Sequence, residues 1–212
     1  QFLQTLHQQA GVNLITHCGA IELKQSNDDS VDVYVDVVLL EQVGAELVAT
    51  GAALNTQLAE EAGLEVQGAV VVDEFCRTSC PDIYAAGDVA IHPALGFSMQ
   101  SWAHAQHQGL TAAKHMLGQE VPYQEIPWLW SDQYDCNIQL LGVPQPNLQC
   151  VVRETSPQQK TFFYFDDQQA LCYVVAVNDA KNIKIAKRWL QRQVQVTPEQ
   201  VADLSLNLMS IK

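Results

Sequence analysis

A predicted strand that ends in small residues and an acid carries the clearest chemical signal. Residues 83–88 read Ile-Tyr-Ala-Ala-Gly-Asp, and the apolar start predicts a buried strand. The small residues would let an extended ligand approach the backbone closely. Asp88 would then lie at the carboxyl end of a strand, where open α/β sheets bind ligands. A carboxylate suits ligand hydroxyl groups, because its charge strengthens the hydrogen bonds that it accepts.

A long helix follows and would bring its amide end to the same ligand. Apolar or small residues recur three and four positions apart between Trp102 and Leu117, and Gly118 follows, which predicts a helix with a defined end. The first amides of a helix lack partners within it, and the helix dipole gives them partial positive charge. That end would stabilise a ligand that gains electron density on reduction. An acid for a polyol and a helix end for a carbonyl-bearing ring indicate a flavin site.

Composition excludes several other classes of protein. The 212 residues include 24 acidic and 11 basic residues, which gives a formal net charge of −13. Such a chain repels the phosphates of nucleic acids and anionic membrane surfaces. No apolar run approaches the roughly 20 residues that cross a bilayer, and residues 1–10 do not read as a signal peptide. Six cysteines in a chain of this length do not form a disulfide scaffold. We therefore expect a cytoplasmic protein with reduced thiols.

The chain divides into three predicted segments of α/β followed by α+β character. Residues 1–47 contain short strands, one of them half-buried and running from Val31 to Leu39 with a period of two. Residues 48–121 hold the strand at 70–72, the acid-ended strand and the long helix. Residues 122–212 contain strands at 138–141, 150–152, 161–165 and 171–177, a helix at 182–190 and a helix start at Thr197. Because the chain begins with Gln1 and the end of a helix, we expect a longer protein to precede it.

Three sequence motifs resemble a known family. The run TSCPDIYAAGDV at residues 78–89 is similar to the second flavin-binding motif of FAD-dependent pyridine nucleotide oxidoreductases. SWAHAQHQG at 101–109 and PWLWSDQYDCNIQLLG at 127–142 resemble the ferredoxin reductase components of ring-hydroxylating dioxygenases, and putidaredoxin and rubredoxin reductases. The similarity runs from about Gly11 to the C-terminus.

The resemblance implies the C-terminal part of a flavoprotein with two dinucleotide-binding domains. It implies a remnant of the NAD-binding domain at 1–47, the second segment of the FAD-binding domain at 48–121, and a C-terminal α+β domain with an antiparallel sheet at 122–212. Asp88 would hold a ribityl hydroxyl of FAD, and Gly51 would lie close to the pyridine nucleotide. The residues that it implies at the cofactors are Gly51, Gly87, Asp88, Trp102, Ala103, Trp128 and Trp130, the last two near the flavin and the docking surface of a partner.

The implied activity is that of an NAD(P)H-dependent ferredoxin reductase in aromatic hydrocarbon catabolism. A hydride would pass from the nicotinamide to FAD, and single electrons would then pass to an iron–sulfur ferredoxin. Alternatives are a rubredoxin or monodehydroascorbate reductase, or a non-enzymatic interaction module. No G-x-G-x-x-G fingerprint occurs, so both phosphate-binding loops would lie before Gln1, and Gln100 replaces an acid that relatives often carry. We therefore expect this chain alone to bind FAD weakly or not at all.

Each functional signal also has a plainer interpretation. Asp88 could be an acid in a surface turn, and Trp102 could be a core aromatic residue. His104 and His107 fit core or solvated histidines better than zinc ligands, because no further ligand accompanies them. Cys76 and Cys80 fit inert thiols better than a redox pair. The basic residues around the helix at 182–190 could form a solvated face or a docking patch for an acidic redox protein; they are Lys181, Lys184, Lys187, Arg188 and Arg192.

Overall fold

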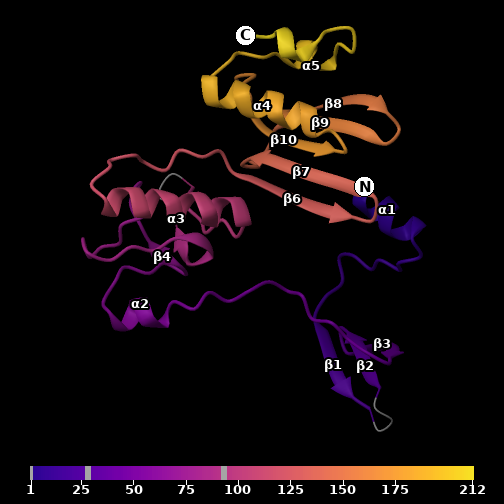
Figure 1. Ribbon diagram of the computed structural model, residues 1–212. Coiled ribbons are helices and arrows are strands. Elements are labelled where there is room, and N and C mark those ends of the chain that lie inside the picture. Colours follow the sequence, from indigo (N-terminus) through magenta and orange to yellow (C-terminus); the bar gives the residue numbers. More distant parts are fainter. Residues whose placement is uncertain (1, 27–29, 92–94) are drawn as a thin grey trace. The chain divides into compact units, whose positions relative to one another are not determined.

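The computed structural model describes residues 2–26, 30–91 and 95–212 (Figure 1). The chain forms two compact units, Gln1–Ala52 and Ala53–Lys212. Each unit has its own secondary structure and is described by itself. In the described part of the chain, no helix combines the length and the apolar character that a bilayer crossing requires.

The first unit contains a helix and a three-stranded antiparallel sheet. After α1 (Phe2–Gln9), the strands β1 (Ile21–Gln25), β2 (Val31–Val35) and β3 (Val38–Val43) lie in the order β1-β2-β3. The prediction of one strand from Val31 to Leu39 was wrong, because the chain reverses at Asp36 and Val37. Both residues have positive φ, 49° and 64°, as a two-residue type I′ hairpin turn requires.

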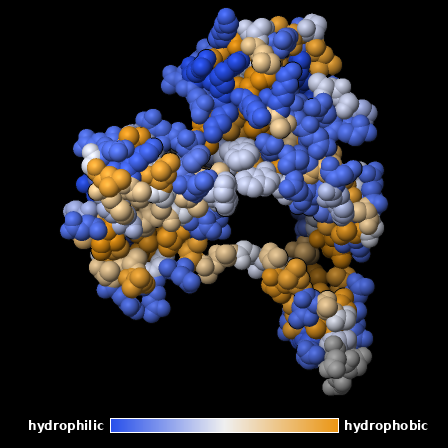
Figure 2. Space-filling model, viewed as in Figure 1, coloured by the Kyte–Doolittle hydropathy of each residue, from blue (hydrophilic) through white to orange (hydrophobic). Residues whose placement is uncertain are grey.

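Apolar side chains lie at the surface of this unit. Val37 and Val38 in the hairpin are 88% and 67% exposed, and Ile21 on β1 is 61% exposed. Figure 2 shows the corresponding orange surface over β1–β3. The sheet of the first unit is therefore not buried by the residues of that unit alone.

The second unit begins with a small α/β part. It contains α2 (Gln57–Glu61), β4 (Val70–Val71), the 3₁₀ turn η1 (Gly87–Val89), β5 (Ala90–Ile91) and α3 (Trp102–Met116). Strands β4 and β5 pair in parallel around a core of Val70, Val72 and Ala90. The predicted strand at 83–86 is wrong in position: these residues form one isolated bridge, between Tyr84 and Arg77, and the strand follows the Gly87-Asp88 turn. A strand needs successive hydrogen-bonded pairs, and among residues 83–91 only Ala90 and Ile91 form two in a row.

The rest of the second unit contains a five-stranded antiparallel sheet, which confirms the predicted α+β character of this part. Its strands are β6 (Trp128–Gln133), β7 (Cys136–Gly142), β8 (Gln149–Ser156), β9 (Gln159–Phe165) and β10 (Leu171–Val177), in the order β6-β7-β10-β9-β8. Helix α4 (Ala180–Arg192) crosses one face of this sheet, followed by α5 (Pro198–Ala202) and the 3₁₀ turn η2 (Leu208–Ser210) (Figure 1). The buried core comprises Leu141, Phe163, Phe165, Val174, Ala176, Ile183, Ile185, Ala186, Trp189, Val196, Val201 and Leu208.

Two sets of hydrogen bonds, a helix cap and a buried arginine, fix the C-terminal segment in place. The predicted cap at Thr197 is present: its hydroxyl accepts from the Gln200 amide at 3.3 Å, and the Gln200 side chain accepts from the Thr197 amide at 2.9 Å. Buried Arg153 on β8 donates to the carbonyl oxygens of Val201, Asp203 and Leu206 at 3.0, 2.6 and 3.0 Å. The guanidinium thereby fixes α5 and the following loop to the sheet.

Gly142 on β7 gives a test of this packing. Its φ is +88°, and a Cβ atom there would overlap the backbone carbonyl of Cys172. We expect Gly142→Ala to lower the free energy of unfolding by about 3 kcal/mol or more, since both the conformation and the close approach oppose a side chain. Urea unfolding measures this change. As a control, Gly109→Ala places its Cβ in open space within α3 and should raise stability by roughly 0.5–1 kcal/mol. Equal effects of the two substitutions would contradict the close approach at Gly142.

Candidate functional site

The Gly87-Asp88 turn packs directly against α3. Gly87 is buried with φ +80°, and a Cβ atom there would lie only 3.2 Å from the Cβ of Ala105. The Gly87 amide donates to the Gln108 side-chain oxygen at 2.7 Å. A glycine is required at this position because both the backbone conformation and the adjacent helix exclude a side chain. The structure thus brings together the turn and the helix that the sequence singled out.

The turn leaves the Asp88 carboxylate accessible. The backbone carbonyl of Asp88 accepts a hydrogen bond from the Ser98 hydroxyl, which fixes the turn from its other side. The Asp88 side chain is exposed, and no described group hydrogen-bonds to its carboxylate. It is therefore available to accept hydrogen bonds from a ligand.

The start of α3 presents free amide groups. Ser101 is the N-cap: its hydroxyl accepts from the His104 amide at 3.3 Å, and its carbonyl accepts from the Ala105 amide at 3.0 Å. In the described residues, the amides of Trp102 and Ala103 have no acceptor. Two donors at the positive end of a helix of 15 residues form a suitable anchor for a ligand oxygen.

Three tryptophans connect the helix start to the C-terminal sheet. The rings of Trp102 and Trp130 meet edge to face with centroids 6.1 Å apart, and Trp130 stacks on Trp128 at 5.1 Å. Trp128 is half-buried, packs against the sheet core, and donates from its indole nitrogen to Gln139 at 3.2 Å. Trp102 and Trp130 are 66% and 41% exposed, so the core-residue alternative is wrong for Trp102, and of the β6 pair Trp130 is the surface residue.

A pocket lies between the loop that precedes α3 and the sheet. Its volume is ≈ 320 Å³, and Gln100 is among the residues that close it. Its lining is mainly apolar: Phe97, Ser98, Met99, Gln100, Leu129, Leu140, Gly142, Val143, Pro144 and Tyr173. The pocket therefore adjoins the segment that joins Asp88 to the helix start.

Two buried polar residues on the inner face of α3, Gln108 and Thr111, were missed from the sequence. The apolar spacing placed Trp102, Gly109 and Met116 on one side, yet all three are exposed. The buried side chains are Ala103, His104, Gln108, Thr111 and Ala112. Residues 104, 108 and 111 are spaced as on one helix face, and this spacing is the only signal that could have revealed them.

His104 anchors α3 to the segment that leads to the sheet. Its Nδ1 lies 2.6 Å from the Tyr123 hydroxyl, and the Tyr123 amide donates to the Glu74 carbonyl at 2.7 Å. Burial, followed by the charge of Glu125, raises the pKa of Tyr123 well above its usual value. The Tyr123 phenol therefore stays neutral. His104 is buried, which agrees with its interpretation as a core histidine.

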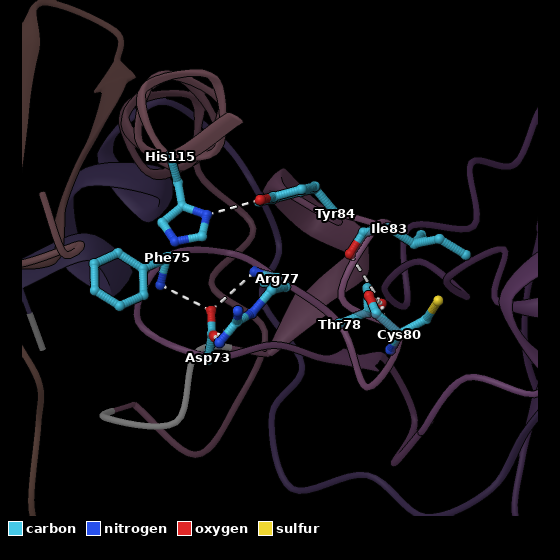
Figure 3. Close-up of polar contacts among 8 residues, drawn as sticks. All are labelled: Asp73, Phe75, Arg77, Thr78, Cys80, Ile83, Tyr84 and His115. Carbon is cyan, nitrogen blue, oxygen red and sulfur yellow. Dashed lines mark hydrogen bonds and ion pairs between the residues drawn. The ribbon is translucent and has the colours of Figure 1, made fainter. Parts of the chain in front are cut away.

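The loop that follows β4 braces the segment before the Gly87-Asp88 turn (Figure 3). Asp73 accepts from the amides of Phe75 and Arg77, each at 2.9 Å, and pairs with the Arg77 guanidinium at 2.9 Å. The Tyr84 hydroxyl lies 2.7 Å from Nδ1 of His115 near the end of α3, and Phe75 stacks on that imidazole at 4.7 Å. The segment carrying Tyr84 is thus bound to α3 three residues before the turn.

The remaining candidate residues show no arrangement for catalysis. Burial, together with the charge of Asp73, raises the pKa of Cys76 to about 12, so its thiol stays protonated and unreactive at neutral pH. Residues 2–26, 30–91 and 95–212 contain no group of three His, Cys, Asp or Glu side chains placed to bind a metal ion.

Gly51 belongs to the first unit, where it is exposed with φ +112°.

Two family models match the chain. The model described as "Pyridine nucleotide-disulphide oxidoreductase" matches residues 1–109, and the model described as "Reductase C-terminal" matches residues 128–212. The first matched range ends within α3. The second range is the antiparallel-sheet domain.

Characterised relatives and solved structures match both parts together. The chain is 37% identical over 185 residues to the anthranilate 1,2-dioxygenase system ferredoxin–NAD(+) reductase component of Burkholderia cepacia, covering 85% of this chain and 44% of that protein. It superposes with a TM-score of 0.88 and 29% identity on the ferredoxin reductase for the CYP199A2 system from Rhodopseudomonas palustris, over 98% of this chain and 52% of the other. The covalent putidaredoxin reductase–putidaredoxin complex matches with a TM-score of 0.87 and 28% identity, over 99% of this chain and 52% of the other. The chain spans about half the length of these relatives.

Asp73 gives a pH-dependent test of the loop in Figure 3. Burial alone would raise the pKa of this carboxyl, but hydrogen bonds from the Arg77 and Phe75 amides and the Arg77 charge outweigh it, so the pKa lies below its usual value. The stabilisation of the fold by the ionised Asp73 carboxylate is therefore complete above the unfolded-state pKa, about 3.9. This stabilisation is lost as the pH falls through the folded-state pKa.

We expect Asp73→Asn to lower the free energy of unfolding by about 1–2 kcal/mol at pH 7, because the charged acceptor is lost. The difference from the unmodified chain should shrink as the pH falls below about 3.9. Thermal or urea unfolding at several pH values measures this. Asp82→Asn, at an exposed acid nearby, is the matched control and should change little. A constant difference at all pH values would contradict the assigned role of the Asp73 charge.

Proposed function

The chain belongs to the pyridine nucleotide-disulphide oxidoreductase family, and on that premise we propose that it forms the C-terminal part of an NAD(P)H-dependent, FAD-containing ferredoxin reductase. When bound, FAD would accept a hydride from the nicotinamide and supply single electrons to an iron–sulfur ferredoxin. The observation that carries the proposal is the Gly87-Asp88 turn held against α3, whose first amides are free. The similar proteins from Burkholderia cepacia and Rhodopseudomonas palustris are ferredoxin reductases, which supports the same activity.

The residues present fit a flavin. The Asp88 carboxylate is exposed and can accept hydrogen bonds from ribityl hydroxyls. Gly87 lets the turn pack directly against α3, because a Cβ atom there would lie only 3.2 Å from that of Ala105. The free amides of Trp102 and Ala103 can donate to a carbonyl oxygen on the pyrimidine edge of the ring and favour negative charge there. All four residues belong to the second unit.

The tryptophans extend this site toward a partner. Trp130 is exposed, and its ring contacts both Trp102 on the helix and Trp128 on the sheet. Aromatic faces at this place would exclude water from a bound ring and line the route by which electrons leave. Because Trp128 is fixed by its bond to Gln139, it would serve as the support for Trp130.

The wider organisation follows from the same proposal. Residues 1–47 would complete an NAD-binding domain, 48–121 an FAD-binding domain, and 122–212 would form the C-terminal domain. Gly51 would lie close to the pyridine nucleotide. The protein would act in the cytoplasm, in a pathway of aromatic catabolism.

The basic patch on α4 is a proposed contact for the ferredoxin. Lys181, Lys184 and Arg192 are exposed. Lys187 is instead bound to Glu125 at 3.2 Å, and Arg188 donates to the Met209 and Ile211 carbonyls. Only the first three therefore remain available to attract an acidic partner, in a chain whose net charge is −13.

The function is tested with the full-length gene product. We expect it to purify with bound FAD and to reduce an iron–sulfur ferredoxin with NADH or NADPH as donor. Asp88→Ala should weaken FAD binding roughly ten- to hundred-fold, because a charged hydrogen-bond acceptor is lost. Asp82→Ala, a nearby exposed acid, is the control. Unchanged FAD affinity in Asp88→Ala would contradict the role of Asp88; absence of FAD binding, or reduction of rubredoxin or monodehydroascorbate in place of ferredoxin, would contradict the assigned activity.

The docking role of α4 is tested by charge reversal. We expect Lys181→Glu combined with Lys184→Glu to slow ferredoxin reduction several-fold at low ionic strength and much less at high ionic strength, since salt screens the attraction. Stopped-flow measurement of the second-order rate constant over a range of salt concentrations detects this. Lys24→Glu combined with Lys114→Glu changes the net charge equally, with both substitutions outside α4, and serves as the control. Identical salt profiles for both double variants would remove α4 from the docking surface.

A further inference from the structure

We propose that Gln108 is a positioning residue for the cofactor: its side-chain oxygen holds the Gly87-Asp88 turn in register with the free amides at the start of α3. The inference rests on the proposed function, because it concerns how the flavin site is held together. Gln108 touches neither the cofactor nor a substrate in this proposal. It acts through Gly87, which precedes Asp88.

The hydrogen bond fixes the orientation of the Gln108 amide. The Gly87 N–H is a donor, so the atom that it meets at 2.7 Å must be the carbonyl oxygen of the side chain. The amide nitrogen therefore points elsewhere. Gln108 is fully buried, which leaves no solvent to compete for the bond.

A second contact makes the position of the turn unique. Gly87 also approaches the Cβ of Ala105, which lies three residues before Gln108 and hence on the same face of α3. One contact is steric and the other directional, so together they oppose both sliding and rotation of the turn on the helix. The backbone of Asp88 and the amides of Trp102 and Ala103 then keep a fixed separation, which favours a ligand held at both ends.

The burial of Gln108 has a cost that its bond to Gly87 explains. Its Nε2 is buried and has no hydrogen-bond partner in the described part of the chain. An unsatisfied buried donor lowers the equilibrium constant for folding by roughly ten- to hundred-fold. An apolar side chain of the same length would avoid that loss. What glutamine contributes at this position is the acceptor for Gly87.

Loss of the acceptor should therefore alter flavin binding and not only stability. Without it, the Gly87 amide is left unsatisfied and the turn can shift along α3. Asp88 and the helix amides would no longer match one ligand, so FAD affinity should fall. The reduction potential of the bound flavin should become more negative, because the amides would stabilise the reduced ring less well.

The experiment compares substitutions at Gln108 with one at exposed Gln106 on the same helix, in the full-length gene product titrated with FAD. We expect Gln108→Met to raise the FAD dissociation constant roughly ten-fold. Gln106→Met should leave it within about three-fold, a difference below 1 kcal/mol. Gln108→Glu, measured at pH 5.5, should stay close to the unmodified protein, because burial keeps the acid protonated and its carbonyl still accepts from Gly87. The flavin potential should shift only in the Met variant.

Each outcome bears on one proposal. FAD affinity and potential in Gln108→Met equal to those of Gln106→Met would overturn the role of Gln108. If circular dichroism shows that the Met variant is unfolded, Gln108→Asn takes its place, since its amide is one methylene too short to reach Gly87. Tight FAD binding by that variant would likewise overturn the inference. Failure of the unmodified protein to bind FAD would instead contradict the proposed function.

Discussion

The close approach between the Gly87-Asp88 turn and α3 is the constraint on which the candidate site depends. Gly87 adopts a positive φ against Ala105, and its amide is held by Gln108. Two features far apart in sequence, an exposed carboxylate and a pair of free helix amides, thereby become parts of one structure. Neither would bind a ligand well alone, because each is a common feature of protein surfaces.

Directional polar contacts, more than apolar packing, set the position of α3. His104 meets Tyr123, Gln108 meets Gly87, and His115 meets Tyr84. The bonds join the helix to two segments of the second unit, one containing Tyr84 and Gly87 and the other containing Tyr123. A hydrogen bond specifies rotation about the helix axis more strictly than a contact between apolar side chains does. Tyr123 also leads into β6, so the bond at His104 places the tryptophans of the sheet beside the helix start.

The sequence predicted those elements whose local pattern matched their final environment. The capped helix at Thr197 and four strands of the C-terminal sheet follow from short-range signals, which tertiary structure reinforces. The hairpin at Asp36 and Val37 was missed because Val37 is β-branched and rarely adopts positive φ, although Asp36 is a common turn residue. The inner face of α3 was missed because hydropathy treats Gln108 as a surface residue, although a partner 21 positions away satisfies its oxygen. Long-range pairing of this kind has no signature within a local window.

Several local departures from folding rules lie in the first two turns of α3. The exposed indole of Trp102, the unpaired amides of Trp102 and Ala103 and the unpartnered amide nitrogen of Gln108 all belong to the first two turns of α3. The two side-chain features could be removed by a single substitution of Trp102 or of Gln108 without disturbing the core of the sheet, whereas the free amides are typical of a helix start. Natural sequences keep such violations mainly where function requires them. A flat ligand with a carbonyl edge and a hydroxylated chain would cover the indole and engage both the amides and Asp88, which makes their coincidence stronger support for a flavin site than any of these residues alone.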